Sequence, residues 1–173
     1  MIPESVQRLD PSDATERARY ERAFYAAFRR TSANRLVRSL WLWDDERERL
    51  AVRVPYEDQR IYVQRADSGD VNAGLAFNLL LRSFQSAAYG FAPPEPLAGC
   101  GEFLTFFSVK PLCLASLLRL CAGVFEDLRR GGFHTSYGTT APRVMPLYRR
   151  LGAEVLATRE INGEFRHFFR LPL

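Results

Sequence analysis

The feature that most constrains this chain is a strand-like segment followed at once by a helix-like segment, over residues 101–130. Its first ten residues are rich in Phe, Val and Thr, a composition typical of a buried strand. Pro111 predicts the break, because proline cannot donate to a sheet ladder and suits the first turn of a helix. Apolar residues then recur at helical spacing until Gly131, at Leu114, Leu117, Leu118, Cys121, Val124, Phe125 and Leu128.

A short turn between a strand and a helix has a chemical consequence. It leaves backbone N–H groups free to bind a phosphate or a polarised carbonyl. Glu102 lies near the start of the apolar strand. Burial there would raise the pKa of its carboxyl group toward neutrality, which makes Glu102 a candidate general base. The alternative is a carboxylate at the strand end that pairs with an arginine.

Length and composition predict one compact domain over residues 1–173. Hydrophobic residues make up 47% of the chain and charged residues 25%, an ordinary globular balance. No apolar run is long enough to cross a bilayer and no leader pattern opens the chain, so we expect a cytoplasmic protein without a membrane partner. Three cysteines without a C-x-x-C pair argue against a disulfide framework and against a metal site. We expect Cys113 and Cys121 to be small core residues.

The net charge of +4 lies entirely in the last part of the chain. Residues 1–98 carry 14 basic and 14 acidic side chains, whereas residues 99–173 carry 10 and 6. This surplus indicates either a solvated face or a site for an acidic or phosphate-bearing partner, because arginine forks suit phosphate geometry. No basic helix and no alternation of aromatic and basic residues appears, so a nucleic-acid partner is not expected.

The rest of the pattern predicts a mixed α/β (α+β) fold with a mostly antiparallel central sheet flanked by helices. Residues 1–10 read as a lead-in, and Asp13 with Glu16 has the spacing of a capping box. Gly74 predicts a bulge or a close backbone approach within its strand. The loop over residues 83–99 is long enough to border a site. We predict helices over residues 14–30, 34–43 and 141–150, and strands over residues 50–54, 60–65, 71–80, 133–140, 154–160 and 164–173.

Three segments, in this order, carry a resemblance to a known family. They are residues 61–75, the run from Glu102 to Ser108-Val109-Lys110-Pro111, and Tyr148-Arg149-Arg150-Leu151-Gly152-Ala153-Glu154. Together they resemble the second and third strands, the fourth strand and the C-terminal motif of the GNAT (Gcn5-related N-acetyltransferase) superfamily. The resemblance covers nearly the whole chain, and it implies a single GNAT-like domain whose central sheet is splayed.

The family's glycine-containing pyrophosphate loop is missing, since Leu112-Cys113-Leu114-Ala115-Ser116-Leu117 follows Pro111. In lacking this loop, the chain is similar to the branch that takes acyl groups from acyl carrier protein. That branch comprises the acyl-homoserine-lactone and N-acyl amino acid synthases. Those enzymes also have an acid at the start of this strand, where Glu102 stands. Their arginine further along the strand is replaced here by Thr105 and Phe106.

The resemblance implies an N-acyltransferase that moves an acyl group from a thioester to a small-molecule amine. It implies no tightly bound cofactor, acyl-CoA or acyl-phosphopantetheine as co-substrate, an acyl carrier protein as a further partner, and a monomer or homodimer. Glu102 would be the base, Tyr148 the general acid and the Val109 N–H the oxyanion donor. The acyl thioester that serves as co-substrate would contact Ser108, Val109, Lys110, Arg143 and Arg149.

Polar residues near the end of the strand over residues 133–140 are further candidates. His134 could act as a base, with His167 as the alternative, although a lone histidine in a strand is more often structural. Thr105, Tyr137 and Thr139 would line the acceptor pocket. Two other hypotheses stay open: an enzyme of the same fold that performs cyclisation or decarboxylation in natural-product biosynthesis, and a non-catalytic binding module.

Overall fold

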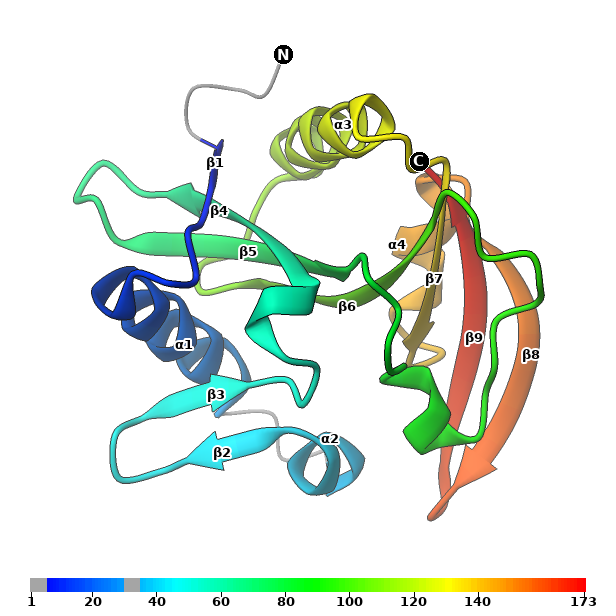
Figure 1. Ribbon diagram of the computed structural model, residues 1–173. Coiled ribbons are helices and arrows are strands. Elements are labelled where there is room, and N and C mark those ends of the chain that lie inside the picture. Colours follow the sequence, from blue (N-terminus) through cyan, green and yellow to red (C-terminus); the bar gives the residue numbers. More distant parts are fainter. Residues whose placement is uncertain (1–5, 30–34) are drawn as a thin grey trace.

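The computed structural model describes residues 6–29 and 35–173 (Figure 1). Its main sheet has seven strands in the order β1-β4-β5-β6-β7-β9-β8, and all neighbours are antiparallel except β6 and β7. A separate hairpin consists of β2 and β3. The strands run over Val6–Arg8 (β1), Leu42–Asp44 (β2), Arg49–Ala51 (β3), Gln59–Arg65 (β4), Val71–Asn78 (β5), Cys100–Ser108 (β6), Thr135–Thr140 (β7), Glu154–Ile161 (β8) and Glu164–Pro172 (β9).

Within the described residues, four α-helices and two short 3-10 helices accompany the strands. They are α1 (Ala14–Phe28), α2 (Arg35–Leu40), η1 (Tyr56–Asp58), η2 (Ser86–Tyr89), α3 (Leu114–Arg130) and α4 (Met145–Arg150). In Figure 1, α1, α2 and the β2–β3 hairpin lie below β4, β5 and β6, and α3 lies above them. The predicted mixed α/β architecture is confirmed. Within the described ranges, no helix combines the length and the apolar character that a bilayer crossing requires.

Apolar side chains that alternate between the two faces of the central strands form two apolar cores. On β5, Leu75 and Phe77 pack with the apolar face of α3, whereas Ala76 faces the cluster under α1. The first core also contains Tyr148 of α4, and the second contains Phe24 of α1. Because successive side chains of a strand point to opposite faces, one sheet supports both helical layers.

Gly74 allows α1 to pack closely on the sheet. A β-carbon at this position would lie 2.6 Å from Phe107 Cε1 and 2.9 Å from Tyr20 Cε2. The Phe107 ring in turn stacks on Phe24 of α1, with ring centroids 5.0 Å apart. Of the two predictions for Gly74, the close approach is the one observed, and the nearby β5–β6 register shift lies between Ala76 and Phe77.

The start of α1 follows the sequence prediction in part. Asp13 caps the helix by accepting hydrogen bonds from the Thr15 N–H at 2.8 Å and from the Glu16 N–H at 3.1 Å. The Glu16 carboxylate does not turn back to the cap, as a complete capping box would require. It binds Arg19 and Arg65 instead.

Several predicted boundaries were wrong. The lead-in contains β1, which pairs with β4. The helix predicted over residues 34–43 ends at Leu40, because residues 42–44 pair with residues 49–51; residues 30–34 lie outside the described residues. The strand predicted over residues 50–54 stops at Ala51, and α4 begins at Met145 instead of residue 141. Cys121 is buried as expected, whereas Cys113 is exposed at the N-cap of α3.

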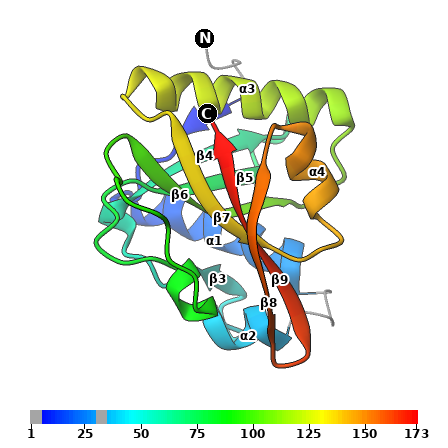
Figure 2. The ribbon, with the colours of Figure 1, turned by 90° about the vertical axis from the view of Figure 1, so that its right-hand side faces the viewer.

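The sheet divides where its two parallel strands separate. Residues Cys100–Phe103 of β6 pair with Thr135–Gly138 of β7, and the pairing ends there although both strands continue. Gly138 makes the last contact possible, since a β-carbon there would lie 2.7 Å from Phe169 Cζ and 3.2 Å from Phe103 Cβ. Figure 2 shows β7, β9 and β8 together in front, with α3 across the top. The sheet is therefore splayed, as the resemblance implies.

Candidate functional site

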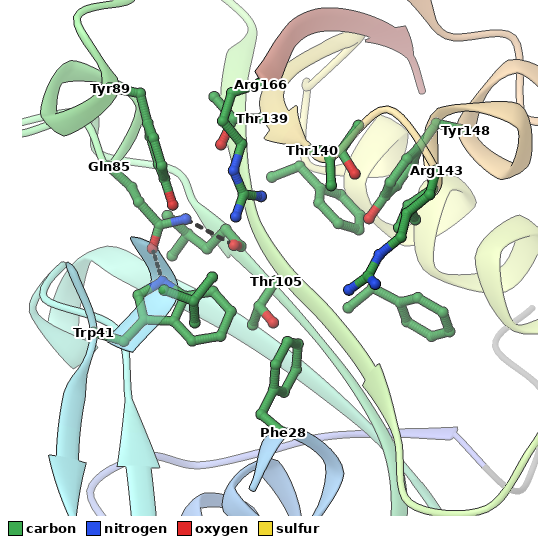
Figure 3. A pocket seen from close by; sticks show the side chains of 16 residues that line it. Phe28, Trp41, Gln85, Tyr89, Thr105, Thr139, Thr140, Arg143, Tyr148 and Arg166 are labelled. Atoms are coloured by element: carbon green, nitrogen blue, oxygen red, sulfur yellow. Dashed lines mark hydrogen bonds between the residues drawn. The ribbon is translucent and has the colours of Figure 1, made fainter. Parts of the chain in front are cut away.

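A pocket lies at the divergence of β6 and β7 (Figure 3). Its walls come from α1, the α2–β2 region, the loop with η2, the second half of β6, the end of β7, the start of α4, and β9. Its labelled lining residues are Phe28, Trp41, Gln85, Tyr89, Thr105, Thr139, Thr140, Arg143, Tyr148 and Arg166. Of the residues predicted for the site, the structure brings together Thr105, Thr139, Arg143 and Tyr148.

A bulge in β6 changes which backbone groups face the pocket. The β5–β6 register shifts so that Ala76 pairs with Thr105 but Phe77 pairs with Phe103. Beyond the bulge, the Val109 N–H donates to the Asn72 carbonyl at 2.7 Å. Hydrogen-bonding direction alternates along an antiparallel strand, so residue 107 also faces β5. The N–H groups of residues 106 and 108 then point away from β5, toward the gap left by β7.

Tyr148 and Arg143 form the end of the pocket nearest α4. The Tyr148 ring stacks on Phe169, with centroids 4.7 Å apart, and meets Phe103 edge-on at 5.5 Å. Burial raises the pKa of the Tyr148 hydroxyl, so the group stays protonated at neutral pH. Its hydroxyl makes no hydrogen bond within the described part of the chain, and Figure 3 shows it near the exposed Arg143 side chain. This end offers one proton donor and one cation.

Arg166 and Gln85 form the opposite end. Gln85 accepts a hydrogen bond from Trp41 Nε1 at 2.9 Å and donates one to the Leu104 carbonyl at 2.8 Å. The guanidinium of Arg166 lies over the Tyr89 ring, 5.5 Å from its centroid. These contacts fix the Gln85 side chain by two hydrogen bonds and place the Arg166 guanidinium against an aromatic ring.

Glu102 does not line the pocket. Its side chain is 1% exposed and accepts hydrogen bonds from the Ser86 N–H at 2.7 Å, the Gln85 N–H at 2.9 Å and Asn78 Nδ2 at 3.2 Å. Burial raises its pKa, and the hydrogen bonds from Ser86, Gln85 and Asn78 act in the opposite direction. The carboxylate is buried as expected, and its partners are N–H donors instead of the arginine that the alternative interpretation expected. Its contacts hold the loop that supplies Gln85 and Tyr89.

Other predicted residues lie away from the pocket. His134 is exposed at the start of β7, the end opposite to the gap, and its Nδ1 lies 3.2 Å from the Thr135 hydroxyl. Tyr137 faces a different cluster and stacks on Phe168, with centroids 5.8 Å apart. His167 pairs with the Thr158 hydroxyl at 2.8 Å. Arg149 is exposed on α4 and does not line the cavity.

Val109 and Lys110 line a second hollow, between α1 and the β4–β5 turn, and Ser108 precedes them on β6. This hollow is larger, about 590 Å³ against about 160 Å³ for the pocket between β6 and β7. The smaller pocket is the better candidate, because Thr105 Oγ1 and Arg166 Nε are buried at its wall without a partner among the described residues. Buried polar groups in native proteins are normally paired, and a bound ligand is one source of partners.

The turn after β6 differs from a glycine-rich phosphate loop. Cys113 occupies the N-cap of α3, and its Sγ lies 3.2 Å from Ser116 Oγ. Hydrogen bonds from the Ser116 hydroxyl and N–H lower the pKa of this exposed thiol. No glycine lies between Ser108 and Leu120, so side chains occupy the space that a close backbone approach to phosphate would need.

Sequence reasoning missed Arg166, Gln85 and Tyr89 as lining residues. The long loop over residues 83–99 was predicted to border a site, which was the available signal for Gln85 and Tyr89. Arg166 was counted only in the basic surplus of the last part of the chain. Its direction depends on the register of β9 against β7, which pairs Thr140 with His167 and thereby sets the face that Arg166 occupies.

Comparison of the sequence with protein-family models and with curated proteins finds no match. Solved structures do match. BjaI, a CoA-dependent acyl-homoserine lactone synthase with SAM and isopentyl-CoA, has a TM-score of 0.73 at 14% identity, over 97% of this chain and 82% of that one. TofI, in a ternary complex with an inhibitor and MTA, has a TM-score of 0.69 at 17% identity, over 96% of this chain and 89% of that one.

A third similar structure is the ribosomal-protein-S18-alanine N-acetyltransferase from Escherichia coli, with a TM-score of 0.60 at 14% identity, over 96% of this chain and 92% of that one. At identities this low, the structural similarity establishes the fold, and the substrates have to be inferred from the residues of the pocket. The chain has a divergent GNAT fold, like that of BjaI and of the N-acetyltransferase.

Proposed function

We propose that this protein is an acyltransferase, which moves an acyl group from a thioester to a small-molecule amine. The observation that carries the proposal is the pocket at the separation of β6 and β7, where the bulge turns the Phe106 N–H away from β5. A thioester lying along β6 would place its carbonyl oxygen beside a donor that the sheet does not use. Tyr148 lines the same pocket, and its hydroxyl makes no hydrogen bond to another residue that the structure describes.

The reaction then follows from these groups. The amine nitrogen attacks the thioester carbon, and the Phe106 N–H stabilises the oxyanion that forms. Collapse of this intermediate breaks the carbon–sulfur bond and forms the amide. Tyr148 donates its proton to the departing thiolate, and the proton lost by the amine restores the tyrosine through solvent. The Val109 N–H is committed to Asn72, so Phe106 takes the role first expected for Val109.

No aspartate, glutamate or histidine is among the described residues that line the pocket. We therefore assign Glu102 a positioning role, through Gln85 and Ser86, in place of the base role. The amine would enter in its neutral form, with its proton released to solvent before attack. The rate of transfer should then follow the ionisation of the acceptor amine.

The donor is proposed to be an acyl thioester of CoA or of a carrier-bound phosphopantetheine. The Ser108 N–H, on the same side of β6 as Phe106, would contact the pantetheine arm. The exposed Arg143, Arg149 and Lys110 would meet its phosphates, because arginine and lysine suit this charge. BjaI, which binds isopentyl-CoA and SAM, supports testing a CoA thioester together with a sulfonium amino acid.

The test is thiol release with acyl-CoA and acyl carrier protein thioesters of several chain lengths, each with a panel of amines that includes S-adenosylmethionine. Mass spectrometry should show an amide formed in equal amount to the thiol. Absence of amine-dependent thiol release with every donor would overturn the proposal. The glycine-free turn after β6 favours one other candidate, a cyclisation or decarboxylation without CoA, and turnover of a substrate that carries no thioester would identify it.

A further inference from the structure

The second hollow, which lies between α1, the β4–β5 turn and the end of β6, has no part in the proposed acyl transfer. Its volume of about 590 Å³ falls within the range of about 300–1,000 Å³ that is typical of small-molecule sites. No residue lines both this hollow and the pocket between β6 and β7. The second hollow is therefore a separate cavity, and its walls indicate what it could bind.

One wall is a face of α1 that is turned away from the core. Four residues of α1 line the hollow at helical spacing: Arg19, Arg22, Ala23 and Ala26. This spacing places their side chains on one side of the helix. Phe24, on the opposite side, is buried in the core under α1. Because two members of the stripe are alanines, space remains beside the helix between the two arginines and the turn.

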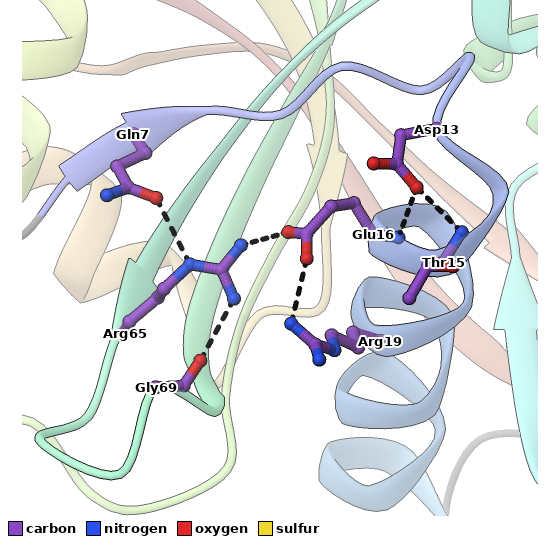
Figure 4. Close-up of polar contacts among 7 residues, drawn as sticks. All are labelled: Gln7, Asp13, Thr15, Glu16, Arg19, Arg65 and Gly69. Atoms are coloured by element: carbon purple, nitrogen blue, oxygen red, sulfur yellow. Dashed lines mark hydrogen bonds and ion pairs between the residues drawn. The ribbon is translucent and has the colours of Figure 1, made fainter.

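The opposite wall is the β4–β5 turn, and polar contacts tie it to α1 (Figure 4). Arg65 donates to the Gly69 carbonyl at 3.0 Å and binds the Glu16 carboxylate of α1. Glu16 also binds Arg19, at 3.0 Å. The side chains of Arg65 and Glu16 are only 19% and 25% exposed. These contacts order both walls, so a ligand would bind without rearranging them.

Two cations at the hollow have capacity for an anion. Arg22 donates from Nε to the Ala18 carbonyl at 3.2 Å, and its terminal nitrogens make no ion pair within the described ranges. Lys110, at the end of β6, likewise pairs with no carboxylate in the part of the chain that the structure describes. The two side chains come from different elements that face the same space. The hollow thus offers positive charge that the protein itself does not neutralise.

The acidic residues at the rim limit the charge of the ligand. Glu48 pairs with Arg29 at 3.3 Å, whereas Asp70 accepts a hydrogen bond from the Ser68 hydroxyl at 2.8 Å. Asp70 has no cation within ion-pair distance among the described residues. Its charge repels a doubly charged ligand more strongly than a singly charged one. The rim therefore favours a carboxylate over a phosphate.

The lining between these charged groups is aliphatic. Val71 and Val109 lie across from Ala26, and the Val109 side chain is exposed although it is apolar. No aromatic residue is among the described residues that line the hollow, so it offers no stacking surface to a nucleobase. An alkyl chain gains stability from apolar area of this kind without any stacking partner.

We propose that this hollow is a second small-molecule site, which binds an alkyl carboxylate of medium length. Arg22 would bind the carboxylate, with Lys110 adding positive charge, and the chain would lie on Ala26, Val71 and Val109. The site goes beyond the proposed acyl transfer and does not depend on it. Lys110 is also proposed to meet the donor phosphates, so the experiment relies on Arg22 and Ala26.

The experiment is calorimetric titration of the full chain with octanoate, with octylammonium, acetate and AMP as comparison ligands. Octanoate should bind about tenfold or more tightly than octylammonium, which has the same chain and the opposite charge. It should bind about 30-fold or more tightly than acetate, which lacks the chain. AMP, which brings a phosphate and a nucleobase, should bind more weakly than octanoate.

Variants then locate the site. Ala26→Phe fills the hollow and should abolish octanoate binding. Arg22→Gln should lower the affinity about threefold or more, and Arg22→Glu about tenfold or more. Arg130→Gln is the matched control, because Arg130 is exposed at the end of α3 and pairs with Glu126. Arg143→Gln, in the pocket between β6 and β7, should leave the affinity for octanoate unchanged.

Amide NMR spectra provide an independent reading of the position. Octanoate should shift the signals of Val71 and Asn72 and leave that of Thr139 in place. The inference is overturned if octylammonium or AMP binds as tightly as octanoate, if the affinity survives in Arg22→Glu, or if Arg143→Gln lowers it. Arg22 is exposed on α1, so its variants keep the test decisive if Ala26→Phe does not fold.

Discussion

The Glu102 carboxylate accepts a hydrogen bond from the Ser86 N–H at 2.7 Å, which links the first part of β6 to the loop that forms one wall of the pocket. The same carboxylate accepts from the Gln85 N–H, and the Gln85 side chain reaches back to the Leu104 carbonyl beside the bulge. A buried acid thus connects the bulge, the loop and the pocket wall without touching the cavity.

Glu102→Gln should destabilise the protein. The amide nitrogen of glutamine would face N–H donors that now meet a carboxylate oxygen, and the lost hydrogen bonds should cost about 2 kcal/mol. For a chain of this length, the melting temperature should fall by roughly 4–8 °C. Thermal unfolding is the measurement, with the exposed Glu154→Gln as control. An unchanged melting temperature with activity abolished would restore Glu102 as the base.

Stability should also depend on pH through Glu102. Burial raises its pKa above the ordinary value, so the folded protein holds this proton more tightly than the unfolded chain does. The resulting stabilisation is fully present below the pKa of glutamate in the unfolded chain, and it is lost as pH rises through the folded-state pKa. Urea unfolding across this range should show a decline in wild type that Glu102→Gln lacks. Identical pH profiles of stability in the two proteins would contradict a raised pKa of Glu102 in the folded state.

Tyr148→Phe should lower kcat by about 100-fold, as expected for removal of a general acid. The fold should be unaffected, because the hydroxyl has no partner in the described structure and the phenyl ring keeps its stacking on Phe169. Steady-state kinetics and thermal unfolding of the same samples separate the two effects. Tyr137→Phe, on the cluster with Phe168, is the matched control. Unaltered kcat in Tyr148→Phe would remove this residue from the chemistry.

Phe106→Pro should lower kcat by about 100-fold or more, since it removes the N–H assigned to the oxyanion. This N–H is not part of the ladder with β5, so circular dichroism should show a folded protein. Phe106→Ala keeps the N–H and loses only the ring, and its kcat should fall much less. Equal losses in the two variants would assign the effect to the side chain instead of the backbone donor.

Arg65→Met should destabilise the packing of α1 on the sheet (Figure 4). Arg65 binds the Glu16 carboxylate and donates to Gln7 Oε1 at 3.1 Å and to the Gly69 carbonyl at 3.0 Å. Its side chain is 19% exposed, so its removal should cost about 1–2 kcal/mol. Urea unfolding measures this loss. Arg47→Met, which removes an ion pair with Asp44 and changes a side chain that is 72% exposed, should change stability by less than about 0.5 kcal/mol.

The sequence was most informative where local pattern and tertiary structure agree. The strand and helix around Pro111 were predicted because apolar spacing changes there from a strand to a helix pattern. The short β1 has only three residues and no periodicity, so its pairing with β4 was not predictable. Residues 42–44 follow a helical pattern in the sequence, but pairing with residues 49–51 overrides that local preference.

The site was predictable only where its residues lie in segments that the sequence pattern identifies. Thr105 and Tyr148 lie in segments whose order resembles a known family, and the structure brings both to the pocket. The partners of Glu102 lie 16 and 17 residues earlier in an irregular loop, so no spacing rule could identify them. Arg166 faces the pocket because of the register of β9, and a one-residue shift would turn it to the other face.

The most direct measurement is a crystal structure with a stable thioether or ketone analogue of an acyl-pantetheine donor. The account predicts that the analogue lies between β6 and β7, with its carbonyl oxygen within hydrogen-bonding distance of the Phe106 nitrogen and its sulfur position near the Tyr148 hydroxyl. An analogue seated in the hollow beside Val109 and Lys110, with the gap between the strands empty, would contradict it.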